Sequence, residues 1–520
     1  MTIDRVPLTV AGARHGPDRH AVPALVACLG DLVGEHVRHC SWKSNDHLLA
    51  ALAGETDLDL LVDRHDAARF AAVASRHGLK RVIPQPAATY PAIEHYLGLD
   101  RQSGRLFHLH VHFQLVLGER YVKNHHLPVE REVLDSTRTL HGVLVPPAEL
   151  ELGILVVRTL LKFRARDVVK DVLRIRAPGI PTETRAEIEW LRGGRDLQAI
   201  RSALDAIGTV VRADVVCSFL DVVARDRRAG LRLAWLRARL RRALRHLRRR
   251  SRMRASAAYA LGLWRHRRHR LLGRRGPPPM TLPGGGATIA LVGADGSGKS
   301  TVAADVARWL GWKLDARVHY LGSKAPSPPT NWFYLGFRAL RRSHRAVSHR
   351  LGNDSPAARL IGALRDLALA LHHVSVSRDR GRRHARAQRR VRAGGIAVFD
   401  RYPLTCLGDR AEHRLLDGPL IAAVLGPRPG WCTRALATVE ARHYRRFGLP
   451  DHLVLLDVDP LVAAHRKPDH HFDVIRSKAR AAAELAALAE AAGADVVRID
   501  ANQPLDRVLL DVKARLWDGL

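Results

Sequence analysis

The chain has 520 residues, enough for about three domains of roughly 150 residues each. Hydrophobic residues make up 46% and charged residues 26%, which excludes a largely disordered, collagen-like or membrane-embedded chain. The 85 Lys and Arg residues against 51 Asp and Glu give a net charge of +34, so we expect a polyanion, a phosphate-rich substrate or an acidic membrane surface as partner. A coding bias toward arginine is the alternative explanation, because only 11 of the 85 basic residues are Lys.

The cysteines and the lengths of the apolar runs indicate in which cellular compartment the protein resides. The five cysteines are scattered, odd in number and form no C-x-x-C pair, which favours reduced thiols in a cytosolic protein. Residues 1–20 lack the apolar segment of a signal peptide, and no apolar run reaches the length of about 18 residues that spans a bilayer. We therefore expect a cytoplasmic protein, with peripheral attachment at the inner membrane face as an alternative.

Composition divides the chain into four parts. Residues 21–147 mix strand-like and helical runs, as in an α+β domain, and residues 148–275 read as an increasingly basic helical segment. Residues 276–286 are rich in Pro and Gly and predict a linker. Residues 287–520 alternate short apolar runs with helical patterns, which predicts an α/β domain with a parallel sheet sandwiched by helices.

A D-x-D motif marks the first domain. Asp57 and Asp59 belong to a strand of period two, so both carboxylates face the same side, where they suit a divalent metal that holds a nucleoside triphosphate. With the preceding Lys43-Ser44, this resembles the nucleotidyltransferase superfamily, whose motif is Gly-Ser, a spacer and D-x-D. The resemblance covers residues 25–145 and implies that Asp57 and Asp59 are metal ligands. Lys43 stands where Gly is usual.

A second strand of this domain carries three histidines on one face. His108, His110 and His112 alternate with apolar residues from Leu106 to Phe113, and imidazole binds transition metals well. They could replace the superfamily's third carboxylate, or form a solvent-facing polar surface. Three hypotheses stay open for the domain: nucleotidyl transfer, a degenerate version that binds a nucleotide or another substrate, and a chance D-x-D.

The middle segment contains 19 Arg, no Lys and no acidic residue from Arg227 to Arg275. An apolar stripe at spacings of three and four predicts a basic amphipathic helix, with members Leu233, Leu236, Leu240, Leu244 and Leu247. Such a helix can pack its stripe on a neighbouring domain, lie on an anionic membrane surface, or grip nucleic acid phosphates.

A glycine-rich loop lies between an apolar strand, Ile289 to Val292, and a helical pattern that ends before Gly311. It fits G-x-x-x-x-G-K-[ST] in the strand–loop–helix context that the motif requires. Glycines let several backbone N–H groups point at one phosphate, and the helix N-terminus adds partial positive charge. Lys299 offers a charge to the β- and γ-phosphates, and Ser300 a hydroxyl to Mg²⁺. The candidate nucleotide-binding residues are Gly293, Asp295, Gly296, Gly298, Lys299, Ser300 and Thr301.

An acidic residue ends another predicted strand, Gly395 to Phe399. The carboxyl ends of parallel strands share one edge of a sheet, so Asp400 is placed to hold Mg²⁺ beside the phosphate loop. Arg401 can grip an acceptor phosphate through two hydrogen bonds. Two further strands are predicted at His452–Leu456 and Asp495–Ile499.

Residues from about 286 to 520 resemble the thymidylate kinase family of P-loop nucleoside monophosphate kinases. The phosphate loop and the Asp400-Arg401-Tyr402 run carry the resemblance, and a basic run from His465 to Lys478 resembles that family's lid. It implies ATP, Mg²⁺ and transfer of a phosphoryl group to a nucleoside monophosphate. Since Gly296 stands where some members have Arg, the lid is expected to supply the charge, from Arg466 with Arg476, Lys467 or Lys478 as helpers.

The resemblance is incomplete at the acceptor. The segment Cys406 to Arg410 does not reproduce the family's stretch at the thymine ring, and the insert from Pro326 to Arg392 is unusually rich in Arg. The expected function is therefore ATP- and Mg²⁺-dependent phosphorylation of a nucleoside monophosphate, with Lys299, Arg401 and Arg466 as catalytic residues. Nucleic acid end processing and non-catalytic, nucleotide-gated binding at a membrane surface are the alternatives.

Overall fold

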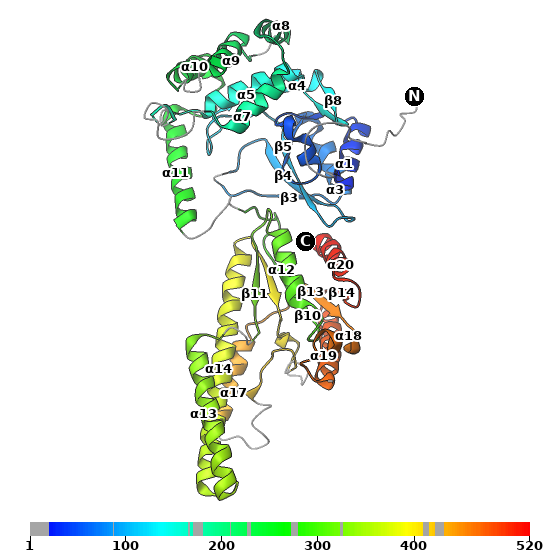
Figure 1. The fold of residues 1–520 in the computed structure, drawn as a ribbon, viewed down its shortest axis with the longest axis vertical. Coiled ribbons are helices and arrows are strands. Elements are labelled where there is room, and N and C mark those ends of the chain that lie inside the picture. Colours follow the sequence, from blue (N-terminus) through cyan, green and yellow to red (C-terminus); the bar gives the residue numbers. More distant parts are fainter. Residues whose placement is uncertain are drawn as a thin grey trace. The chain divides into compact units, whose positions relative to one another are not determined.

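The computed structural model describes residues 20–86, 88–164, 167–169, 180–207, 210–225, 230–271, 279–322, 326–408, 415–421 and 431–520. The chain forms two compact units, unit 1 from Met1 to Met280 and unit 2 from Thr281 to Leu520 (Figure 1). The expected linker, 276–286, contains this boundary, and its residues 276–278 lie outside the described part. Among the described helices, none has a stretch long and apolar enough to cross a bilayer.

Unit 1 begins with a mixed five-stranded sheet in the order β1-β2-β5-β4-β3. β2 pairs parallel with β5, and the other pairs are antiparallel. The strands of unit 1 are β1 (His39–Ser41), β2 (Leu58–Val62), β3 (Lys80–Val82), β4 (Ile93–Leu99), β5 (Leu106–His112), β6 (Val116–Leu117), β7 (His125–His126), β8 (Arg138–Leu140) and β9 (Val143–Val145).

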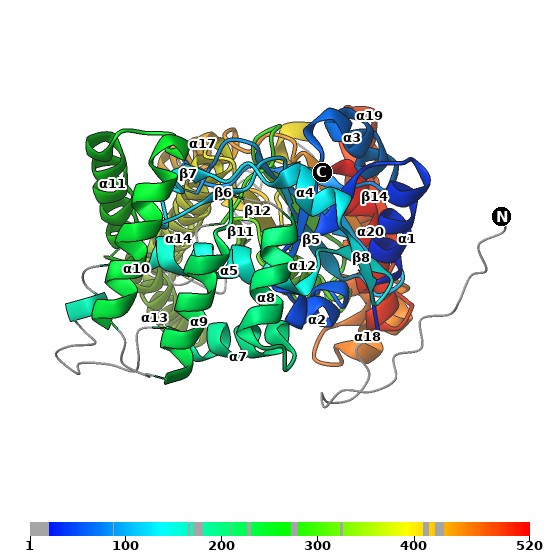
Figure 2. The same ribbon diagram turned by 90° about the horizontal axis from the view of Figure 1, so that it is seen from above.

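Helices cover this sheet and continue into the middle segment, where α5, α7, α9 and α10 gather (Figure 2). The α-helices are α1 (Pro23–Gly34), α2 (Leu48–Leu52), α3 (Ala67–Arg76), α4 (Glu130–Asp135), α5 (Ala148–Lys162), α7 (Thr182–Arg192), α8 (Leu197–Ile207), α9 (Ala213–Arg225), α10 (Gly230–Ala243) and α11 (Arg252–Leu271). Short 3₁₀ turns are η1 (Asn45–His47), η2 (Arg64–Asp66) and η3 (Leu244–Leu247).

The alternation of side chains on β2 and β5 decides which of them can meet. Phe107, Leu109 and Val111 lie in a core with α1 and α3, whereas Leu61 belongs to the core that contains α5. Successive side chains of a strand point to opposite faces, so Asp59 and His110 project toward the α5 side of the sheet. The register pairs Asp59 with His110 directly.

The expected single basic helix is interrupted. α10 ends at Ala243, η3 follows, and α11 starts at Arg252. The apolar stripe is buried in the core of unit 1 together with α5 and α9, through Leu233, Leu236, Leu240 and Leu244. Of the three hypotheses for this segment, insertion of the stripe into a membrane is therefore disfavoured, because the protein core already covers it.

Unit 2 is built on a wholly parallel sheet in the order β11-β12-β10-β13-β14. Its strands are β10 (Ala287–Val292), β11 (Ala316–Tyr320), β12 (Ile396–Asp400), β13 (His452–Asp457) and β14 (Asp495–Asp500). β10 and β12 are buried along their whole length, as parallel strands covered on both faces are. The four strands expected from sequence are present with ends shifted by at most two residues.

Helices lie on both faces of this sheet. α14, α17 and α19 contribute to one core with alternate residues of β10, β12 and β13, and α12 packs against α20 through Trp309 and Trp517. The helices are α12 (Lys299–Leu310), α13 (Pro328–Leu351), α14 (Pro356–Arg392), α17 (Trp431–Tyr444), α18 (Pro460–Arg466), α19 (Phe472–Ala491) and α20 (Leu505–Gly519), with the 3₁₀ turn η4 (Thr405–Leu407). The Arg-rich insert forms α13 and α14, a long hairpin that extends away from the sheet (Figure 1).

One buried carboxyl group ties α5 to the loop that precedes α2. Glu151 accepts hydrogen bonds from the backbone N–H of Asn45 at 3.2 Å and from its Nδ2 at 2.9 Å. Burial raises the pKa of Glu151 from 4.5 to about 7. The folded chain therefore binds this proton more tightly than the unfolded chain, and its stability falls as pH rises from 4.5 to about 7.

We predict that Glu151→Gln makes the unfolding free energy less dependent on pH between 5 and 7. The shift corresponds to a contribution of order 3 kcal/mol, since each pKa unit is worth about 1.4 kcal/mol. Urea unfolding followed by circular dichroism at several pH values measures the slope. Glu149→Gln is the control, because Glu149 lies on the same helix and pairs with Arg195 at 2.8 Å. An unchanged slope in Glu151→Gln would contradict the assignment.

Candidate functional site

The loop from Gly293 to Gly298 joins β10 to α12 and has a backbone that requires glycine. Gly293, Gly296 and Gly298 have φ angles of +148°, +88° and +90°. A Cβ atom at Gly293 would lie 2.7 Å from the carbonyl oxygen of Leu456, and one at Gly296 would lie 2.5 Å from that of Ala463. The loop is therefore curled tightly against the ends of β13 and α18, with the N-terminus of α12 directly behind it.

Ser300 and Asp400 meet at the start of α12. The Ser300 hydroxyl donates to Asp400 Oδ2 at 2.6 Å. Asp400 ends β12, which pairs with β10 so that Asp400 is opposite Leu291. The second oxygen, Asp400 Oδ1, is buried and has no hydrogen-bond partner among the described residues. The structure thus brings together the hydroxyl and the carboxylate that sequence analysis assigned to a metal.

Lys299 is buried under its own loop. Its Nζ donates to the carbonyl oxygens of Gly293, at 3.0 Å, and of Ala294. Burial lowers the pKa of Lys299 to about 8, and the nearby guanidinium of Arg401 acts in the same direction. Thr301, which directly follows the motif, is exposed on the first turn of α12.

Asp295 links the phosphate loop to two cations. Its Oδ1 accepts from Arg401 Nη2 at 3.2 Å, and its Oδ2 accepts from Lys478 Nζ at 2.5 Å. Burial opposes ionisation of Asp295, but the hydrogen bond and charge of Lys478, with the charge of Arg401, lower its pKa to about 2. Asp295 is therefore ionised and holds both cations at the loop.

Of the residues expected to form the lid, only some lie near the phosphate loop. Lys478, on α19, contacts the phosphate loop, whereas Arg466 donates to the carbonyl oxygen of Ala501 at 2.8 Å, after β14. Arg476 pairs with Asp473 on its own helix at 2.8 Å. The structure places Lys478, rather than Arg466, beside the loop: α18 contacts the loop through Ala463, but Arg466 at its end binds Ala501 instead.

Arg401 is held by carboxylates on two sides. Besides Asp295, it donates from Nη1 to Asp417 Oδ2 at 3.2 Å, and its own φ angle is +70°. The buried Arg380 of α14 fixes Asp417 in turn, at 2.8 Å from Nη2 to Oδ1. Backbone strain of this kind persists where the surroundings over-determine a conformation, which is common at functional sites. Neither Asp417 nor Arg380 belongs to a motif, so the sequence alone does not identify them as site residues.

A pocket adjoins these groups at the carboxyl end of β10. Apolar and charged residues line it together: Leu291, Val292, Gly293, Asp295, Lys299, Arg401, Tyr402, Leu415, Leu416, Asp417 and Lys478. Of the segment from Cys406 to Arg410, residues 409 and 410 lie outside the described part. The pocket places apolar side chains and two arginine-bound carboxylates next to the loop.

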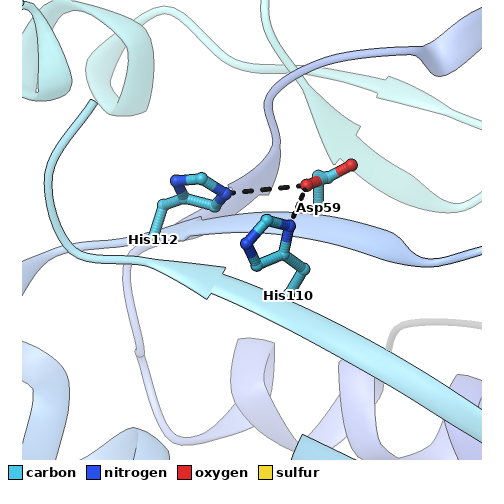
Figure 3. Close-up of side chains that lie close together, drawn as sticks. All are labelled: Asp59, His110 and His112. Atoms are coloured by element: carbon cyan, nitrogen blue, oxygen red, sulfur yellow. Dashed lines mark ion pairs between the residues drawn. The ribbon is translucent and has the colours of Figure 1, made fainter. Parts of the chain in front are cut away.

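A second cluster lies in unit 1, on the α5 side of its sheet (Figure 3). Asp59 Oδ1 is 2.7 Å from His110 Nδ1 and 3.6 Å from His112 Nε2. Both ring nitrogens of the buried His112 lack a hydrogen-bond partner among the described residues. Asp57 directly precedes β2, and its Oδ1 lies 2.8 Å from His108 Nδ1 instead. The two carboxylates of the D-x-D motif therefore have separate histidine partners.

Cations surround Asp59. Lys43 Nζ is 2.7 Å from Asp59 Oδ1 and 5.3 Å from the centre of the Trp42 ring, which Arg158 also approaches. Burial, followed by repulsion from Lys43, lowers the pKa of Lys123 to about 7. Burial and Arg158 lower that of Lys162 to about 8. Although burial opposes ionisation of Asp59, Lys43 and the two histidines lower its pKa well below the usual range.

The chain is similar in sequence to proteins that are named as ATP-binding proteins. No model of a known protein family matches the chain. Over 242 residues, 45% of this chain and 86% of the relative, it is 27% identical to the uncharacterized ATP-binding protein YghR of Escherichia coli K12. It is 28% identical to the uncharacterized ATP-binding protein YghS of the same strain over 229 residues, 42% of this chain and 88% of the relative.

Two solved structures of deoxyadenosine kinase from M. mycoides are weakly similar. One, with dCMP and dCDP as products, is 12% identical, covers 45% of this chain and 100% of its own, and has a TM-score of 0.28. The other, with dCTP, is 13% identical, covers 44% and 98%, and has the same TM-score of 0.28. Likeness at this level supports no inference about this chain.

Gly296 and Gly298 form a matched pair for testing the loop. Their φ angles differ by only 2°, but an added Cβ meets a backbone oxygen at Gly296 and nothing within 4 Å at Gly298. We predict that both alanine variants lose about 1 kcal/mol of stability to the positive φ, and that Gly296→Ala loses about 1–3 kcal/mol more through the clash with Ala463. Urea unfolding measures both variants; equal losses would contradict the close packing against α18.

Proposed function

We propose that unit 2 transfers the γ-phosphoryl group of ATP to a nucleoside monophosphate, as thymidylate kinase-like enzymes do. The observation that carries the proposal is the 2.6 Å contact between Ser300 and Asp400 at the end of a glycine-rich loop. It is the arrangement that Mg²⁺-dependent phosphoryl transfer requires, with a hydroxyl, a carboxylate and a buried lysine at one helix N-terminus. ATP binding by two relatives supports the choice of donor.

The residues present fit a Mg²⁺ ion. Ser300 Oγ and the unpartnered Asp400 Oδ1 are hard oxygen ligands, the kind that Mg²⁺ prefers. Mg²⁺ bound there would neutralise charge on the β- and γ-phosphates. The unpartnered oxygen is itself a reason to expect a cation, because a buried carboxylate oxygen without a partner is costly.

The chain's own residues bind and orient the phosphates. Lys299 exchanges the carbonyl oxygens of its loop for the β- and γ-phosphate oxygens, which are stronger acceptors. Lys478 is held at the loop by Asp295 and stabilises the charge that spreads over the moving group. An oxygen of the acceptor phosphate then attacks the γ-phosphorus, the bond from the γ-phosphorus to the β-phosphate oxygen breaks, and ADP leaves.

Arg401 and the adjoining pocket are proposed to bind the acceptor. Arg401 can exchange its bond to Asp417 for an acceptor phosphate, because a guanidinium binds phosphate through two parallel hydrogen bonds. Tyr402 and Leu416 line this pocket, whose volume of about 20 Å³ has to widen to admit a base. Arg466 has no direct role in this proposal, since it is engaged at Ala501.

We predict that Lys299→Ala, Ser300→Ala and Asp400→Asn each lower phosphoryl transfer from ATP by at least about 100-fold with the fold intact, because each removes a group that stabilises transition-state charge. Chelation of Mg²⁺ with EDTA should have the same effect and be reversed by added Mg²⁺. Transfer of ³²P from γ-labelled ATP measures the activity and circular dichroism the fold. Lys513→Ala is the charge-matched control, since Lys513 pairs with Asp305 at 2.9 Å outside the loop.

The acceptor is identified by supplying nucleoside monophosphates, sugar phosphates and oligonucleotides in parallel with γ-labelled ATP. Label in a nucleoside diphosphate supports the proposal. Label only in oligonucleotide ends, with binding that falls steeply as salt rises, would replace it with nucleic acid end processing. No transfer to any acceptor, at unchanged ATP binding, would leave a nucleotide-binding protein without this activity.

We propose further that unit 1 is a divergent nucleotidyltransferase-like domain that does not transfer nucleotides. The observation that favours this is the pairing of Asp59 with the ammonium of Lys43 and of Asp57 with His108. A Mg²⁺ ion shared by two carboxylates does not fit this arrangement, because the carboxylates are separately engaged and additional lysines oppose a dication. Cations around one carboxylate favour a phosphate-bearing ligand instead.

We predict that the chain incorporates no label from α-labelled nucleoside triphosphates and releases no pyrophosphate from them in the presence of Mg²⁺. Thin-layer chromatography of the products, with all four ribonucleotides and small-molecule or nucleic acid acceptors, is the measurement. Pyrophosphate release that disappears in Asp59→Asn would show that unit 1 is an active nucleotidyltransferase.

A further inference from the structure

A pocket of about 270 Å³ in unit 1 is lined by arginines that the proposed function does not use. It lies among the loop before β7, the end of α5, α10, η3 and α11. Its lining residues are Gly118, Glu119, Val122, Asn124, His125, Leu161, Arg237, Arg241, Arg248, Arg252, Ala255, Ser256 and Tyr259. The Arg-rich middle segment therefore covers the core of unit 1 with its leucines and lines this pocket with four of its arginines.

The pocket carries a large excess of positive charge. Four guanidinium groups face one carboxylate, that of Glu119. Glu119 is shared, at 2.6 Å from Arg237 and at 3.6 Å from Arg164. Among the described residues, no carboxylate lies within ion-pair distance of Arg241, Arg248 or Arg252. Like charges held this close repel one another, and an anion between them relieves the repulsion.

Hydrogen-bond donors in the pocket are also unsatisfied. His125 is 5% exposed, and neither of its ring nitrogens has a hydrogen-bond partner in the described chain. The buried Nε atoms of Arg237 and Arg248 also have no hydrogen-bond partner among the described residues. Burial, together with Arg241 and Arg248, lowers the pKa of His125 to about 4, so the ring is neutral and keeps one N–H to donate. Buried donors without partners are rare because each costs about 1–3 kcal/mol.

The walls of the pocket are fixed before any ligand arrives. Tyr121, in the loop before β7, has a φ angle of +74° and packs so closely on α11 that a Cβ atom at Gly262 would lie 2.6 Å from its side chain. Arg164 lies over the ring of Tyr259 on the same helix, at 3.8 Å from the ring centre. A pocket whose loop and helix are packed in this way loses little entropy on binding, which favours affinity.

We propose that this pocket binds a small anion with two or three linked phosphates. Adjacent guanidinium groups suit closely spaced phosphate oxygens, which accept several charge-assisted hydrogen bonds at once. A wider hollow of about 1040 Å³ shares Arg237, Arg241, Arg248 and Arg252, and leaves room for the rest of a phosphorylated molecule outside the pocket. A membrane headgroup fits less well, because the apolar stripe of α10 is buried.

The experiment titrates sodium tripolyphosphate into the full-length Lys299→Ala chain by calorimetry, so that the lysine of unit 2 is absent from every sample. We expect Arg252→Gln to weaken binding by tenfold or more. Arg254→Gln is the matched control, since Arg254 is exposed on the same helix and lines neither hollow, and its affinity should stay within twofold. Orthophosphate should bind more weakly than tripolyphosphate.

A second variant, Arg241→Gln, distinguishes loss of binding from loss of folding. Arg241→Gln removes one of the mutually repelling charges, so the free variant should unfold at a temperature no lower than the parent chain. The rise in melting temperature with tripolyphosphate should nevertheless be largely lost. Equal weakening in Arg252→Gln and Arg254→Gln would show unspecific charge attraction and overturn the proposal. So would binding of a single-stranded oligonucleotide without binding of tripolyphosphate, which would make the surface a nucleic acid site.

Discussion

The pairing of β10 with β12 is the constraint on which the site in unit 2 depends. Five consecutive residue pairs fix the register, and the last of them places Asp400 opposite Leu291. Two residues beyond Leu291 the chain curls into the glycine loop, so the end of β12 can only lie beside the start of α12. The contact of Ser300 with Asp400 follows from this register, and so does the position of Arg401, the next residue along the chain. A shift of one residue would turn the carboxylate to the other face of the sheet.

Asp295 organises the cations in the absence of phosphate. One carboxylate within the loop holds Arg401, which directly follows β12, and Lys478 of α19, and their attraction favours the ionised form of all three groups. A phosphate that enters the loop therefore meets positive charges already in place and need not draw flexible side chains together. Preorganised charge of this kind costs no reorganisation at the moment of reaction, which makes it more effective than the same charges in water.

Local patterns predicted the phosphate loop and four strands of unit 2, because the buried strands read as apolar runs and the loop is defined by its glycines. They missed β11, an edge strand with no buried residue and no such run. The lid could not be assigned in the same way. Arg466 and Lys478 both belong to one basic run, and only the packing of α18 and α19 decides which of them reaches Asp295. The partners of the D-x-D motif could not be assigned from its sequence either. The period of two predicts that Asp57 and Asp59 face the same side, but their partners His108 and His110 come from the neighbouring strand. Contacts across strands depend on register, which the sequence of one strand does not contain.

The basic segment shows why an amphipathic pattern alone does not identify a partner. A leucine stripe flanked by arginines is expected of a helix at a membrane surface and equally of a helix that covers a protein core. In unit 1 the stripe is buried in the core, through Leu236 and Leu240 among others, and Arg237 and Arg241 of the same helix line the pocket together with Arg248 and Arg252. These four arginines line a pocket, where a compact polyphosphate can touch several guanidinium groups and a flat bilayer can touch few. Burial of the stripe thus determines what the arginines are able to recognise.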